Sequence, residues 1–161
     1  MMRRMPMLTL LLATMVMLAE APTCAVPEGW VAESTATRMH LTPRGDERET
    51  KISIAPLKVS AGKLSEQLVT NVLRATAASM NAQDAMEATV ASRDRPDGKA
   101  HWVDCAVATE KVRSRLRVAV VTSGESAALV VLVCDPETFE AHLPAMNLVM
   151  DTFEMRPKSK D

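Results

Sequence analysis

Two serines stand in sequence contexts that resemble those of catalytic nucleophiles. Ser60 opens the sequence Ser60-Ala61-Gly62-Lys63, which has the S-x-x-K spacing of serine acyl-enzymes at a helix start. Ser126 follows Gly124-Glu125 and partly matches the nucleophile elbow, which needs a helix after the serine. The accompanying S-D-N and K-T-G sequences are absent, a strand is predicted after Ser126, and helix capping explains Ser60. A serine hydrolase is therefore the weakest of three functional hypotheses.

The other residues that commonly carry chemistry are dispersed along the chain. His40, His101 and His142 share no ligand spacing, and no HExxH or CxxC sequence occurs. The five glycines are isolated, so they form no phosphate- or dinucleotide-binding loop. We therefore predict no metal, no cofactor and no catalytic residue.

Basic side chains gather on one predicted strand. Arg113, Arg115 and Arg117 occupy alternate positions, which places them on one face of that strand, and Lys111 precedes them. The face is expected to be exposed. It is either a solvated surface or a docking site for an acidic partner, and these three arginines are the candidate binding residues.

The N-terminus has the three parts of a secretory signal peptide. Arg3 and Arg4 precede the apolar stretch Met7–Leu18, and small residues follow it. The stretch is shorter than the roughly 20 residues that a membrane-spanning helix needs. We therefore predict a signal peptide over residues 1–25 and a periplasmic or secreted protein that does not span the membrane after cleavage.

The cleavage position has three alternatives. Cleavage after Ala25 places small residues, Thr23 and Ala25, at the recognition positions and is preferred. Cleavage after Ala21 would put Pro22 next to the scissile bond. In the third alternative Cys24 is lipidated and becomes the first residue, although Pro22 and Thr23 do not match the usual sequence before such a cysteine.

Composition limits the partner. The formal net charge is −1, and removal of the predicted signal peptide changes it by one unit, so no basic face for nucleic acid is expected. Tyrosine is absent, so the core must be built mainly from aliphatic residues and methionine. The expected partner is another protein of the cell envelope.

Hydrophobic periodicity predicts one α+β domain over residues 26–155, followed by a polar tail over residues 156–161. Helical spacing predicts an amphipathic helix over Gly62–Met80, capped by Ser60, and two short C-terminal helices separated at Pro144. Alternating or continuous apolar runs predict the strands Trp30–Thr35, Thr37–Thr42, Lys51–Leu57, Ala88–Arg93, His101–Thr109, Leu116–Thr122 and Ala127–Cys134.

Two features of these strands bear on function. Pro56 lacks a backbone donor, so Lys51–Leu57 is expected at a sheet edge, whereas Ala127–Cys134 is expected to be buried on both faces. If the last three strands form a meander, Cys105 and Cys134 share one face at a separation of about 15 Å. A disulfide needs Cα atoms within about 7 Å, so none is expected between these core thiols.

The order of elements resembles a known fold. The chain opens its domain with Pro27-Glu28-Gly29-Trp30, continues through the long helix and the meander, and ends with a helix at Met150-Asp151-Thr152-Phe153. This layout is similar to the α/β/α sandwich of PsbP, of the Ran-binding transport factor of the same fold, and of the DcrB-like periplasmic proteins. Those domains usually carry several Phe and Tyr residues in their strands, which this chain lacks. The resemblance implies a non-catalytic adaptor or assembly factor.

We therefore predict an antiparallel sheet packed by the long helix and the C-terminal helices. The function most consistent with the sequence is a small exported binding or assembly protein of the cell envelope that is not an enzyme. The second hypothesis is a periplasmic immunity or inhibitor protein that blocks a toxin or hydrolase.

Overall fold

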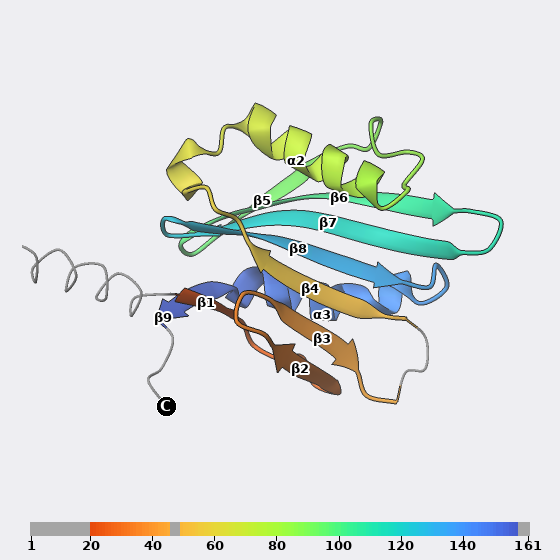
Figure 1. Cartoon of the computed structure of the whole chain (residues 1–161), viewed down its shortest axis with the longest axis horizontal. Coiled ribbons are helices and arrows are strands. Elements are labelled where there is room, and N and C mark those ends of the chain that lie inside the picture. Colours follow the sequence, from red (N-terminus) through yellow and green to blue (C-terminus); the bar gives the residue numbers. More distant parts are fainter. Residues whose placement is uncertain (1–19, 46–48, 158–161) are drawn as a thin grey trace, which may run out of the picture.

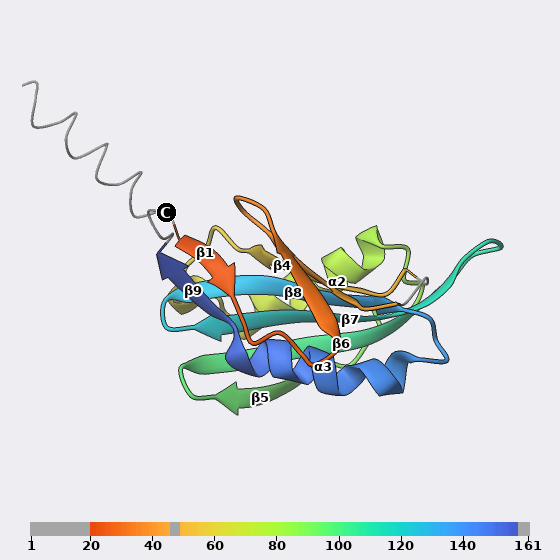
Figure 2. The same ribbon diagram turned by 90° about the horizontal axis from the view of Figure 1, so that it is seen from below.

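The computed structural model describes residues 20–45 and 49–157. Residues 1–19 of the predicted signal peptide and residues 158–161 of the predicted tail lie outside the described residues. In the described chain, one large sheet separates two helices, which gives the three layers of an α/β/α sandwich (Figures 1 and 2).

The main sheet is antiparallel throughout and has the strand order β2-β3-β4-β8-β7-β6-β5. The meander β6-β7-β8 follows the prediction because each strand alternates or is continuously apolar and short turns join them. The strands are β2 (Trp30–Ser34), β3 (Met39–Pro43), β4 (Lys51–Pro56), β5 (Ala91–Arg95), β6 (Gly98–Ala108), β7 (Arg113–Ser123) and β8 (Ser126–Cys134).

Strand β4 lies inside the sheet, between β3 and β8, so the prediction that it forms an edge is wrong. Pro56 is the last residue of the strand, where its missing N–H does not interrupt the ladder. The next amide, that of Leu57, already donates to the carbonyl of Ala127 at 2.9 Å. The edges of the main sheet are β2 and β5.

Helix α2 (Glu66–Ser79) begins four residues later than predicted. A single turn of 3₁₀ helix, η1 (Ala61–Lys63), comes first and is preceded by Ser60. The N-cap of α2 is Ser65, whose hydroxyl accepts the amide of Leu68 at 3.1 Å. Ser60 is thus separated from the helix that it was expected to cap.

Helix α3 (Phe139–Thr152) is one continuous helix, not the two that Pro144 predicts. Pro144 lies in the second turn on the exposed side, so it disturbs no residue of the buried face, and its missing N–H removes only one helical hydrogen bond near the N-terminus. An unbroken apolar face follows it, in which Met146, Val149 and Met150 are buried.

A second, two-stranded sheet joins the two ends of the described chain. Strand β1 (Glu20–Thr23) pairs antiparallel with β9 (Glu154–Pro157). The amide of Ala25 also donates to Oγ1 of Thr152 at 2.9 Å. The folded unit therefore includes residues on both sides of the predicted 26–155 domain, and β9 takes in the start of the predicted polar tail.

The register of the meander places Cys105 and Cys134 on opposite faces, which corrects the expectation that they share one. Cys105 pairs with Leu116, and Leu116 pairs with Val133, so Cys134 is the next residue along and points to the other side. The two-residue turn between Ser123 and Ser126 fixes this register, and a shift of one residue moves every side chain to the other face. Both side chains are buried, with the sheet between them.

Candidate functional site

The three candidate arginines have very different surroundings. Arg113 is exposed, Arg115 is half-buried and Arg117 is only 7% exposed. Helix α3 crosses the face that carries the last two (Figure 2). The prediction of one exposed arginine face is therefore wrong at Arg117 and holds only partly at Arg115, because the sequence does not show which face a helix will cover.

Arg117 forms a complete set of contacts beneath α3. Its Nε and Nη2 donate to the two carboxylate oxygens of Asp104 at 2.7 and 2.9 Å. Its Nη1 donates to Oδ1 of Asn147 in α3 at 3.1 Å, and its guanidinium lies 5.1 Å from the ring centre of Trp102. These bidentate and stacking contacts are those of a structural arginine that fixes α3 to the sheet.

Strand β5 adds two more arginines to the same interface. Arg93 Nη2 donates to Oδ1 of Asp151 at 2.6 Å, while Arg95 donates to the carbonyls of Thr122 and Phe153, both at 2.7 Å. Burial lowers the pKa of Arg95, against the opposing charge of Asp151. Arg115 also stacks on Phe139 of α3, with its guanidinium 4.6 Å from the ring centre. We call these four residues, Arg93, Arg95, Arg115 and Arg117, the arginine clamp.

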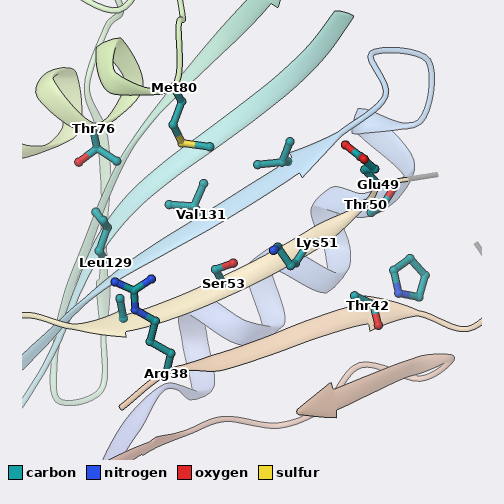
Figure 3. A pocket seen from close by; sticks show the side chains of 13 residues that line it. Arg38, Thr42, Glu49, Thr50, Lys51, Ser53, Thr76, Met80, Leu129 and Val131 are labelled. Carbon is teal, nitrogen blue, oxygen red and sulfur yellow. The ribbon is translucent and has the colours of Figure 1, made fainter. Parts of the chain in front are cut away.

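A groove opens on the opposite face of the sheet, beside α2 (Figure 3). Helix α2 packs over β6 and β7, and it leaves β8, β4 and β3 uncovered on that face. The groove has a volume of about 900 Å³. Its lining residues are Arg38, Thr42, Pro43, Glu49, Thr50, Lys51, Ser53, Ala55, Thr76, Met80, Leu129, Val131 and Val133.

The floor of the groove is mostly apolar. Leu129, Val131 and Val133 of β8 are half-buried there, whereas the alternate residues Val130 and Leu132 are fully buried under α3. The prediction that this strand is buried on both faces is therefore wrong. One helix is about 10 Å wide and strands are about 4.8 Å apart, so α2 can cover only about two strands.

Charged side chains border this apolar floor. Arg38 and Lys51 lie along the β3–β4 side, and Glu49 lies toward the end near Thr50 (Figure 3). Within the described residues neither cation is within ion-pair distance of a carboxylate. Sequence reasoning missed this site because its parts are far apart in the chain and meet only through the pairing of β4 with β8.

The two candidate serines lie together in a smaller hollow of about 220 Å³. Ser60 and Ser126 both line it, with Lys58 and Glu125 among their neighbours, and no histidine is among its lining residues. The histidines lie on three other elements: His40 bonds Ser53 Oγ at 3.1 Å, His142 stacks edge-on against Trp30, and His101 lies on β6. In the part of the chain that the structure describes, no three His, Cys, Asp or Glu side chains gather to hold a metal ion.

Neither α2 nor α3 is long and apolar enough to cross a membrane, and residues 20–45 and 49–157 contain no other helix that is.

The arrangement of layers and strands defines the protein as one with the PsbP-like fold, as the resemblance in the sequence predicts. It is similar to the solution structure of cyanobacterial PsbP (CyanoP) from Synechocystis sp. PCC 6803, with a TM-score of 0.56, 13% identity, and coverage of 86% of this chain and 94% of that one. It is also similar to the crystal structure of LpqN, involved in cell envelope biogenesis of Mycobacterium tuberculosis, with a TM-score of 0.51, 11% identity, and coverage of 86% and 85%. No family model and no curated protein matches the sequence.

Proposed function

We propose that this protein is a non-catalytic binding protein of the cell envelope and that its partner docks in the groove beside α2. The observation that carries the proposal is the half-buried apolar surface of Leu129, Val131 and Val133, which α2 and α3 leave uncovered. Apolar surface of this kind, bordered by charge, is typical of interaction sites.

Two further findings support this role. A fold neighbour, LpqN, is described as involved in cell envelope biogenesis, which agrees with the export signal predicted here. The serine pair that could suggest hydrolysis lies in a different hollow, whose lining residues include no histidine as a general base. The groove supports binding better than the hollow supports catalysis.

The test compares a valine substitution inside the groove with one outside it. Val131→Lys places a charge in the groove floor, whereas Val112→Lys changes an exposed valine, 51% accessible, on the β6–β7 turn. Proteins that co-purify with the exported chain after mild chemical crosslinking are compared by mass spectrometry. We expect Val131→Lys to lose a partner that Val112→Lys retains.

A third variant separates lost binding from lost folding. Lys51→Glu alters the exposed rim of the groove and should leave the circular dichroism spectrum and the melting temperature unchanged. It should nevertheless weaken partner recovery. Identical partner sets in all three variants would refute the groove as the binding site.

A further inference from the structure

The groove has the dimensions of one additional helix in the α2 layer. In the strand order β4-β8-β7-β6, α2 lies over β7 and β6, and the groove lies over β4 and β8. The centres of these two pairs are two strand spacings apart, about 10 Å. Packed helices lie about 8–10 Å apart, so a helix in the groove would pack against α2 and the sheet at once.

The lining residues offer apolar contacts on two sides of such a helix. Val131 and Val133 form the floor, and Met80 extends from the wall that α2 provides (Figure 3). Ala55 of β4 is small and lets the backbone of an occupant approach the sheet. A helix with an apolar stripe directed at β8 and α2 would remove these side chains from water.

The charges on the far side specify the remaining face of the occupant. Arg38 and Lys51 lie on the β3–β4 side, away from α2, and no described carboxylate forms an ion pair with either of them. Among the described residues that line the groove, Glu49 is the acidic one, and it lies toward one end. Acidic residues on the side of a helix facing β3 would complement both cations.

We propose that the groove binds an amphipathic α-helix of a partner protein, with its apolar stripe against β8 and α2 and its acidic residues beside Arg38 and Lys51. The inference rests on the proposed function and adds the kind of partner. A second copy of this chain fits less well, because the apolar faces of its α2 and α3 are already packed on its own sheet. A single acyl chain is narrower than a helix and would leave much of the groove unfilled.

Photo-crosslinking in living cells tests the proposal on the full chain. A photoreactive amino acid replaces Thr76, which lines the groove, or Ala78, which is exposed outside it two residues further along α2. Adducts are isolated, and the crosslinked segment of the partner is mapped by mass spectrometry. The Thr76 site is also combined with Arg38→Glu and Lys51→Glu together, or with the control pair Lys99→Glu and Lys111→Glu at exposed positions elsewhere.

We expect a Thr76 adduct to one protein, mapped to a segment with a helical apolar stripe and acidic residues. Its yield should fall at least tenfold in the Arg38→Glu and Lys51→Glu variant and stay unchanged in the control pair. An adduct to lipid, to a second copy of the chain, or to a strand or loop of a partner protein would overturn the helix proposal. An adduct to a strand or loop of a partner would still leave the proposed function intact. A Thr76 yield no greater than that of Ala78 would overturn both.

Discussion

Replacement of Arg117 by methionine tests whether the arginine clamp holds α3 on the sheet. The substitution keeps most of the aliphatic stem but removes the guanidinium, and with it both bonds to Asp104 and the bond to Asn147. Removing one partner of a buried ion pair costs about 3–5 kcal/mol. The side chain of Asp104 remains 31% exposed, so water can partly solvate the carboxylate left behind. We therefore expect the free energy of unfolding to fall by about 3 kcal/mol.

Urea unfolding measures this change and is followed by circular dichroism. Tryptophan fluorescence is avoided because Trp102 would respond directly to the loss of its neighbour Arg117. Arg113→Met is the matched control on the same strand, and an exposed substitution of this kind should stay within about 0.5 kcal/mol of the wild type. Adding Asp104→Asn to Arg117→Met should cost nothing further, since the unpaired carboxylate is gone. The coupling energy of the pair then equals the cost of Asp104→Asn alone, on the order of 0.5–3 kcal/mol.

Equal stabilities of Arg117→Met and Arg113→Met would refute the clamp and restore the interpretation of these residues as a solvated face. A change in the dependence of the unfolding free energy on urea, in place of a shift in the midpoint, would indicate that α3 detaches before the sheet unfolds.

Three more predictions follow from other parts of the fold. A chain that begins at Val26, the predicted mature N-terminus, should melt about 4 °C or more below one that begins at Glu20, because it lacks β1 and the bond from Ala25 to Thr152. Equal melting temperatures by calorimetry would mean that β1 adds no stability. Burial and the charge of Lys99 lower the pKa of His101, so the unfolded chain binds a proton at this residue more readily than the folded protein does, and stability should decline as pH falls below about 6.5. His101→Gln should reduce this decline, measured by urea titrations at pH 7 and pH 5. Burial, with the charges of Asp84 and Asp104, raises the pKa of Cys105 to about 11, so alkylation of this thiol at pH 8 should be at least about tenfold slower in the folded protein than in denaturant. In denaturant, Cys105 and Cys134 should both react without reductant, and a need for reductant would contradict the strand register.

Much of the fold could be predicted from local sequence patterns. The pair β2 and β3 and the meander β6-β7-β8 are encoded by alternation and turn residues that lie close together in the chain. Their register could not be predicted as well, because one residue more or less in a turn transfers Cys134 from one face to the other. The interior position of β4 could not be predicted because Pro56 lacks a backbone donor, which favours an edge strand. Whether the missing donor interrupts the ladder depends on where the strand ends.

The candidate site depends on features that no short stretch of sequence encodes. Alternation places Arg115 and Arg117 on one face but does not show that α3 covers it. The same holds for Val131 on the opposite face, where the width of a single helix leaves part of the sheet open. In both cases the missing information is which helix packs over which strands, and this is decided by contacts between distant parts of the chain.

The pairing of β4 with β8 has a consequence for how the protein folds. Strand β8 acquires its β7 partner through a two-residue turn, but its β4 partner is synthesised before the whole of α2 and the strands β5 to β7. Closing so long a loop is slow, whereas the hairpin forms early. Until β4 arrives, β8 exposes a long apolar edge that can pair with other chains. The same strand that forms the floor of the groove is therefore the expected point of aggregation during folding, and rapid refolding should require dilute protein.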